Sequence, residues 1–265
     1  MRIRISSLIG PGAACLVSLL AAGCPHRLPD VPPAERLESA PAVMEAVGAA
    51  GRRLRSLRAT GTVDMRRGTK RIKATMLAVL ERPARLRFET ESFFEQPLSI
   101  LVTDGMEFSM WDLDQGRFVV GRATPANVAR VIPIPMDGPE VAGILFGDPP
   151  WIPYATAELA WDDGCYRLTL RNARQRQVVR IHPVRFRPLE VTCHLGDRLW
   201  YRLEYEEWHQ RPEDVFVPAK VFFEMPAEEI RLIMKLKHAE ANPALDEGLF
   251  KLHPPQDLPV ERLEP

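Results

Sequence analysis

The chain has 265 residues, 46% hydrophobic and 26% charged, a composition typical of one large soluble domain or two small ones. Its 35 basic and 35 acidic residues cancel to a formal net charge of +0, so there is no basic field to attract nucleic acid, and we expect no nucleic-acid partner. The 25 prolines disfavour long helices and favour short strands joined by loops.

The N-terminus differs from the rest of the chain. Arg2 and Arg4 precede an apolar run that ends in small residues directly before Cys24. Residues 1–23 therefore resemble a bacterial lipoprotein signal peptide, which would make Cys24 the lipid-modified first residue of the mature chain and its attachment to the membrane. An ordinary secretory peptide cut nearby is the alternative. Pro25 is not the Asp that commonly retains lipoproteins at the inner membrane, which favours the periplasmic face of the outer membrane.

Residues 24–40 carry four prolines and predict an extended tether. A helix is then predicted from Pro41, a favourable first-turn residue, with an apolar stripe that includes Val43 and Val47. From Ala59 the hydrophobic period changes to two, which indicates β-strands. The predicted strands are 59–66, 70–81, 84–92, 97–104, 106–113, 116–122, 156–162, 165–172, 177–183, 188–195, 198–208, 214–225 and 229–238.

Two short helices interrupt the strands. Thr124 followed by proline predicts the start of the first, and Asp137 followed by Gly-Pro predicts the start of the second, which we expect to end at Gly147. No linker separates two domains, so we expect residues 41–265 to form a single domain. A large antiparallel sheet with one polar face must curl to hide its other face, and the helices can fill the concavity.

Motifs of catalysis and metal binding are missing from the sequence. No two of the six histidines are three or four residues apart, and no nucleophile motif or paired Cys-x-x-Cys occurs. Cys165 and Cys193 lie in predicted strands with one strand between them, about 9.6 Å apart, which favours free thiols over a disulfide. We therefore expect no enzyme activity, no cofactor and no metal.

Many apolar side chains are expected to point to one face of the sheet or to come from the second short helix. Rich in Met and Phe, this face predicts either a soft, adaptable cavity lining or an ordinary packed core, and composition alone does not separate them. The candidate lining residues are Met76, Leu86, Phe88, Ile100, Val102, Phe108, Met110, Phe118, Ile144, Leu145, Phe223 and Leu232.

Residues 80–83, Leu-Glu-Arg-Pro, and the hairpin of residues 98–111, which turns at Asp104-Gly105, resemble the signature of the bacterial outer-membrane lipoprotein carrier family, LolA and LolB. The resemblance implies a mainly β fold with a few helices: an unclosed antiparallel β-barrel of about eleven strands, with a helical lid over an apolar cavity. It also implies acyl chains of lipoproteins or other lipids as ligands, a periplasmic carrier as donor, a monomeric state and no enzyme activity. Cys24 favours the lipid-anchored LolB type. A lipid-binding sensor or envelope-assembly scaffold on the same fold is the alternative.

The resemblance also assigns roles to particular residues. Arg82 matches the family arginine that bonds backbone carbonyls of the lid helices, so it is a candidate latch; the alternative is an edge arginine that faces solvent. Phe93 and Phe94 fall in the loop where LolB-type receptors carry a protruding apolar residue that contacts the membrane. The alternative for both is that they fold back into the core.

Overall fold

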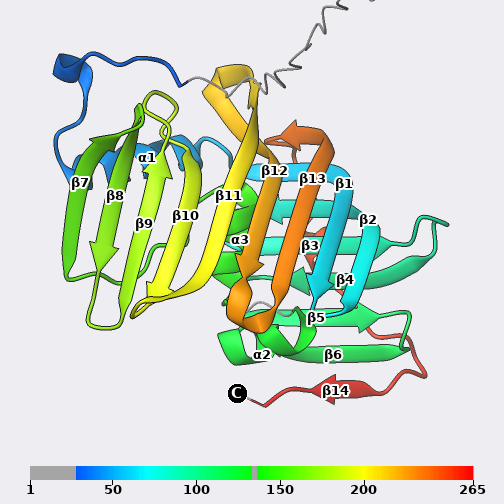
Figure 1. Cartoon of the computed structure of the whole chain (residues 1–265). Helices are drawn as coiled ribbons and strands as arrows, with labels where there is room; N and C mark the ends of the chain where they lie inside the picture. The colour runs from blue at the N-terminus through cyan, green and yellow to red at the C-terminus, as the bar shows by residue number, and fades with distance from the viewer. Residues whose placement is uncertain (1–27, 133–135, 265) are drawn as a thin grey trace, which may run out of the picture.

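The computed structural model of this chain describes residues 28–132 and 136–264. These residues form three α-helices, four short 3₁₀ helices and one sheet of 14 strands (Figure 1). The α-helices are α1 (Ala40–Arg52), α2 (Pro125–Val131) and α3 (Gly138–Phe146). The strands are β1 (Ser56–Arg67), β2 (Lys70–Glu81), β3 (Arg85–Glu91), β4 (Pro97–Thr103), β5 (Glu107–Asp112), β6 (Arg117–Arg122), β7 (Thr156–Asp162), β8 (Cys165–Arg171), β9 (Gln175–Ile181), β10 (Pro188–Leu195), β11 (Arg198–Arg211), β12 (Val215–Met225), β13 (Ile230–Ala241) and β14 (Val260–Arg262). The 3₁₀ helices are η1 (Pro33–Glu35), η2 (Pro212–Asp214), η3 (Pro226–Glu228) and η4 (Glu247–Phe250).

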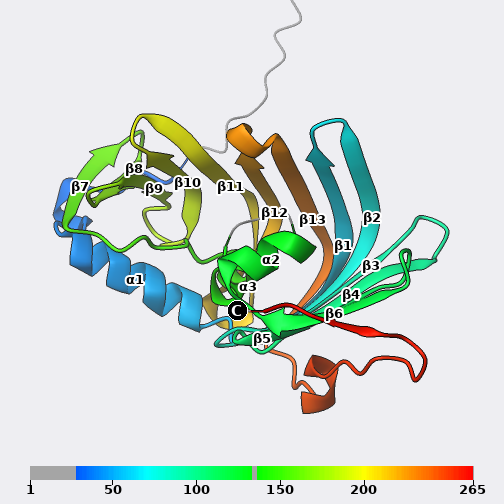
Figure 2. The same ribbon diagram turned by 90° about the horizontal axis from the view of Figure 1, so that it is seen from below.

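Two antiparallel meanders, β1–β6 and β7–β13, join where β1 pairs with β13. The sheet runs from β14 at one edge to β7 at the other, and these two edges do not pair with each other, so the barrel is unclosed. The only parallel pair in the described sheet is β14 with β6. Figure 2 shows the sheet curved around one side of the molecule, with all three α-helices on its concave face.

Local sequence explains where the helices begin and end. The Ser39 hydroxyl accepts from the Ala42 backbone N–H at the start of α1. Asp137 and Glu140 form a reciprocal capping box at the start of α3. Gly147 ends α3 with φ of 79°, a left-handed conformation that side chains with a Cβ rarely adopt.

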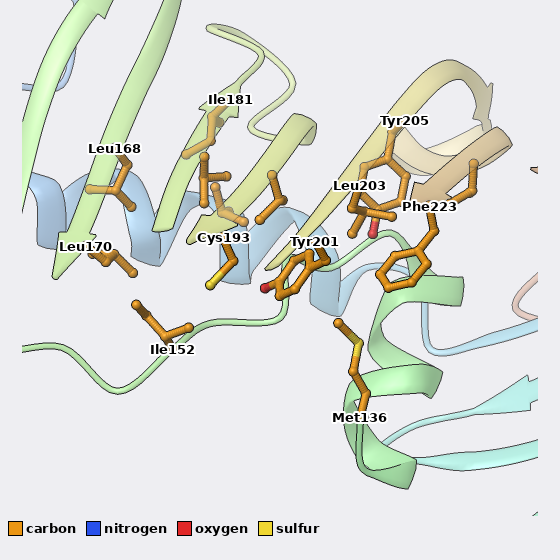
Figure 3. Close-up of a cluster of buried hydrophobic side chains, with 14 of the residues drawn as sticks. Met136, Ile152, Leu168, Leu170, Ile181, Cys193, Tyr201, Leu203, Tyr205 and Phe223 are labelled. Carbon is orange, nitrogen blue, oxygen red and sulfur yellow. The ribbon is translucent and has the colours of Figure 1, made fainter. Parts of the chain in front are cut away.

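A large apolar core fills the concave side of β8–β12. Figure 3 shows Met136, which precedes α3, pointing toward Tyr201 and Phe223 from the sheet. The core also holds a polar chain, in which the buried Gln177 amide donates to the Pro150 carbonyl at 2.7 Å and to the Tyr201 hydroxyl at 2.9 Å. This side of the barrel is therefore packed and hydrogen-bonded as an ordinary core.

The mainly β, unclosed antiparallel architecture with helices on its concave face is confirmed. The count of about eleven strands is wrong, because the described residues form 14. All 13 strand ranges predicted from hydrophobic period correspond to β1–β13 within a few residues, whereas β14 has only three residues, too few to show a period. Cys165 and Cys193 lie on β8 and β10, and both are free and buried.

Candidate functional site

The concave side of β3–β6 holds a small apolar cavity beneath α2 and α3, which we call the inner cavity. Its volume is about 20 Å³, room for about one water molecule. An acyl chain cannot enter it unless the helices move. The cavity is lined by Leu86, Leu101, Thr103, Phe108, Ala123, Val128, Val131, Ile132, Gly138 and Val141.

Most of the candidate lining residues lie on the concave side of the sheet. Leu86 and Phe108 line the inner cavity itself. The others belong to the neighbouring apolar clusters, either fully buried or packed against them: Met76, Phe88, Met110, Ile144, Leu145, Phe223 and Leu232. These contacts place the residues around the site, and a role in ligand binding stays a prediction.

The prediction that Ile100, Val102 and Phe118 line the cavity is wrong, because these three residues lie on the opposite, convex face of the sheet. The register aligns Phe88 with Leu101, and Leu101 with Met110, so Leu101 and not its neighbours faces inward on β4. Residues 100–102 are all apolar because both faces of β4 are covered, and such a strand has no period of two to reveal which face is inner.

Arg82, between β2 and β3, lies at the C-terminal end of α1. Its Nε donates to the Leu54 carbonyl at 2.8 Å and its Nη2 donates to the Gly51 carbonyl at 3.0 Å. Its Nη1 forms an ion pair at 2.7 Å with Asp148, just beyond α3. Arg82 therefore bonds carbonyls at the end of α1 and reaches the α3 region through a carboxylate.

A second arginine, which the sequence analysis did not single out, contacts α3 directly. Arg187 is 1% exposed, and its Nη2 donates to the carbonyls of Phe146 at 2.7 Å and Gly147 at 2.9 Å. Its Nη1 lies 3.5 Å from Asp148, and its guanidinium stacks 4.6 Å from the Trp208 ring centroid. Asp148 thus bridges the arginine on the end of α1 to the arginine on the end of α3.

Burial lowers the pKa of Arg187, because desolvation penalises its charged form more than Asp148 stabilises it. Within the described residues its Nε has no hydrogen-bond partner. The sequence offered one signal for this residue, since Arg-Pro occurs at Arg82-Pro83 and again at Arg187-Pro188. The signal is weak, because Arg211-Pro212 is a third copy and lies at the start of η2 instead of on a helix end.

Phe93 and Phe94 lie in the β3–β4 loop and are 55% and 88% exposed. They do not fold back into the core. The Lys73 ammonium lies 5.8 Å from the Phe93 ring centroid. Exposed apolar side chains beside a cation are compatible with contact to a lipid surface, and that role stays a prediction.

The predicted lipid anchor, Cys24, lies outside the described residues. Part of the predicted tether does contact the domain. Val31 is buried, the Leu37 backbone N–H donates to the Tyr166 hydroxyl at 2.8 Å, and the Arg36 guanidinium lies over the Trp161 ring. Residues 31–37 therefore run along the β7–β8 end of the sheet.

The described residues also limit the kind of site. Across residues 28–132 and 136–264, no group of His, Cys, Asp and Glu side chains is arranged to hold a metal ion. No helix in the same residues combines the length and apolar character needed to cross a membrane.

Comparison with known proteins identifies the fold. No protein-family profile and no curated protein sequence matches this chain. Among solved structures, it is similar to a DUF1329 family protein from Desulfovibrio piger, with a TM-score of 0.56, 12% identity, and 81% of this chain and 98% of that chain covered. It is also similar to a putative outer membrane lipoprotein-sorting protein domain from Vibrio parahaemolyticus, with a TM-score of 0.55, 12% identity, and coverage of 80% and 97%. A LolA superfamily protein from Nitrosomonas europaea matches with a TM-score of 0.53, 11% identity, and coverage of 81% and 99%. The chain therefore has the LolA-like fold, as the sequence resemblance implied.

Proposed function

We propose that this protein is a lipid-anchored envelope protein that binds acyl chains of lipoproteins or other lipids and delivers them to the outer membrane, without enzymatic chemistry. The observation that carries the proposal is an apolar site closed by two short helices on a LolA-like fold. Cys24 would hold the mature chain at the periplasmic face of the outer membrane. A periplasmic carrier protein would donate the cargo to the monomeric protein.

In this proposal, the structure represents a closed state, because the inner cavity of about 20 Å³ has no room for an acyl chain. Loading requires α2 and α3 to move away from β3–β6. Arg82, Arg187 and Asp148 oppose this motion by holding the ends of α1 and α3 together. Cargo would displace the helices, since each buried CH₂ group contributes about 0.8 kcal/mol.

The latch is tested with Arg82→Leu. We expect the fold to survive and fluorescent fatty acid to load about tenfold faster, because the variant loses the ion pair with Asp148 through which Arg82 connects the end of α1 to the end of α3. Arg58→Leu is a matched control, since Arg58 is exposed and lies 4.0 Å from Glu240, away from the helix ends. Equal loading rates in both variants and the parent would contradict the proposed role of Arg82 as a latch.

Membrane contact is tested with the double variant Phe93→Glu and Phe94→Glu. We expect cargo binding to be kept and delivery to vesicles to be impaired, because charged side chains resist entry into a bilayer interface. Val184→Glu serves as a control, since Val184 is also exposed, at 57%, but lies in the β9–β10 loop. If cargo binding and delivery fall together, the loop has a structural role instead.

The small size of the inner cavity favours a second candidate, a non-enzymatic lipid-binding sensor or assembly scaffold on the same fold. A scaffold needs a stable packed core and no transfer of cargo. Native mass spectrometry of mature protein extracted from membranes, followed by transfer of the bound acyl cargo to acceptor vesicles, separates the two. Bound acyl cargo that moves to vesicles supports delivery, whereas protein without lipid that also fails to bind fatty acid contradicts it.

A further inference from the structure

The convex face of β4–β6 carries a much larger space than the inner cavity. It lies between these strands and the C-terminal segment, residues 242–264, and we call it the outer groove. Its volume is about 590 Å³, within the range of about 300–1,000 Å³ typical of small-molecule sites. The groove is lined by Val102, Thr103, Asp104, Glu107, Phe108, Ser109, Phe118, Val120, Gly121, Arg122, Phe250, Lys251, Leu252, His253, Pro254, Val260, Arg262 and Leu263.

The C-terminal segment is fixed at both ends of the groove. At η4, the Arg87 guanidinium donates to the Leu249 carbonyl at 3.1 Å. At the other end, β14 pairs with β6, and Glu261 forms an ion pair with Arg117 at 2.6 Å. Figure 2 shows η4 on the side of β3–β6 away from α2, and β14 continues the sheet as its edge strand next to β6. The wall that this segment forms is therefore anchored at both ends.

Part of the lining of the outer groove, which we call its floor, consists of apolar residues on the convex face of β4–β6. Val120 is half-buried and Val260 is 37% exposed, so both offer apolar surface to the groove, whereas Val102 and Phe118, at 3% and 1% exposed, are already covered beneath it. Phe250 and Leu252 extend this surface along the wall formed by the C-terminal segment. These side chains offer a path for a hydrocarbon chain that does not require α2 or α3 to move.

Cations outnumber carboxylates along the groove. Lys251 and Arg262 on the C-terminal segment, and Arg122 on β6, form no ion pair within the described residues. Of the two carboxylates, Asp104 accepts from backbone N–H groups of its own turn, and Glu107 lies opposite Arg122 in the register. The wall formed by the C-terminal segment is therefore the part that favours an anionic group.

We propose that the outer groove binds a single-chain anionic amphiphile of the fatty-acid type. The hydrocarbon chain lies along Val120, Phe250 and Leu252, and the carboxylate faces Lys251 and Arg262. The site is separate from the inner cavity, and it does not depend on the delivery proposed above. It would allow the protein to hold an acyl ligand while α2 and α3 stay closed.

Photo-crosslinking with a long-chain fatty acid that carries a diazirine in its chain tests the site on the full mature protein. Peptide mapping by mass spectrometry should find saturable labelling of residues 249–262, none of which lines the inner cavity. Labelling confined to residues 125–146 would place the ligand in the inner cavity and overturn the proposal. Non-saturable labelling spread over the surface would overturn it as well.

The charge requirement is tested with Lys251→Glu and Arg262→Glu together. This variant should bind fatty acid roughly tenfold more weakly and should discriminate less against an alkylamine of equal length. The matched control, Lys237→Glu with Arg198→Glu, changes the same number of exposed charges on β13 and β11. Equal loss in both variants would mean that net charge, and not the groove, governs binding.

Filling the groove gives an independent measurement. Ser109 lies between Val102 and Val120 in the register of the convex face, so Ser109→Trp should occupy the floor. We expect loss of labelling in residues 249–262 with a circular dichroism spectrum like that of the parent. Undiminished labelling in a folded variant would overturn the proposal, and the charge variant still decides the question if Ser109→Trp does not fold.

Discussion

Strands β4–β6 are apolar on both faces, yet the two faces are covered very differently. On the concave side, α2 and α3 contribute Val128, Val131 and Val141, and the remaining cavity measures about 20 Å³. On the convex side, the C-terminal segment leaves a groove of about 590 Å³. The same three strands therefore border both a tightly covered packing interface and an open groove.

The covering layer explains the difference. A helix directs side chains at i, i+3 and i+4 into the sheet and can fill the space between neighbouring strands. The C-terminal segment crosses the strands as extended chain, and its Pro254, Pro255 and Pro259 have no N–H with which to pair against an edge. It is held to the sheet by the Arg87–Leu249 hydrogen bond at one end and by the pairing of β14 with β6 at the other. The space beneath the C-terminal segment is therefore larger than the space beneath α2 and α3.

The largest expected effect comes from truncating neighbouring residues on β4. In lipid-free protein, Leu101→Ala should lower the free energy of unfolding by about 3 kcal/mol, because it removes a buried side chain and enlarges the small apolar cavity that this side chain lines. Val102→Ala should cost about 1 kcal/mol, since the outer groove beside this buried side chain lets water fill the space that its truncation leaves. Urea denaturation measures both. Equal losses per carbon removed would mean that the two faces are packed alike.

Leu101 and Val102 also show how far the sequence could predict the structure. Hydrophobic period located β1–β13, and cap residues located α2 and α3, because both signals are local. The inward face of β4 was assigned one residue off, because Ile100, Leu101 and Val102 are all apolar. The C-terminal cover over these residues could not be inferred from the strand itself.

Local sequence patterns also predicted part of the candidate site, but not the contacts between residues far apart in the chain. Arg82 was identified because its Arg-Pro dipeptide belongs to a motif that resembles a known family. Arg187 was missed because its contacts to the α3 carbonyls join residues 41 and 40 positions apart, and no local pattern encodes them. The outer groove was missed for the same reason, since it exists only where residues near 102, 118 and 252 meet.

A smaller effect is expected from Arg187→Met, which tests what keeps the concave face closed. Methionine can fill part of the volume, but the carbonyls of Phe146 and Gly147 lose their buried donor, so we expect a loss of about 2 kcal/mol of unfolding free energy. Binding of a hydrophobic dye at the concave face should increase, and labelling of the outer groove should not change.

Arg82→Met is the comparison for this variant, because the Arg82 side chain is 24% exposed whereas that of Arg187 is 1% exposed. We expect Arg82→Met to cost less. If Arg187→Met leaves the free energy of unfolding unchanged, the cost of desolvating the buried guanidinium offsets all its contacts, as occurs for some buried ion pairs.

The smallest effect is a pH dependence at the start of α3. Burial raises the pKa of Glu140 above its ordinary value of 4.5, because desolvation of the carboxylate outweighs the hydrogen bond that it accepts from the Asp137 backbone N–H. The folded state then binds this proton more tightly than the unfolded state. The stability that Glu140 contributes is fully present below pH 4.5 and is lost as the pH rises through the raised value.

Glu140→Gln removes this titration and keeps an oxygen that can accept from Asp137. Its stability relative to the parent should therefore increase as the pH is raised from 4 toward neutrality, which urea denaturation at a series of pH values measures. Glu140→Ala loses the acceptor too, so it should be less stable than Glu140→Gln at every pH. A constant difference between Glu140→Gln and the parent would show that the carboxylate is solvated, and that the helical cover over β4–β6 is less tightly packed at this end than at Leu101.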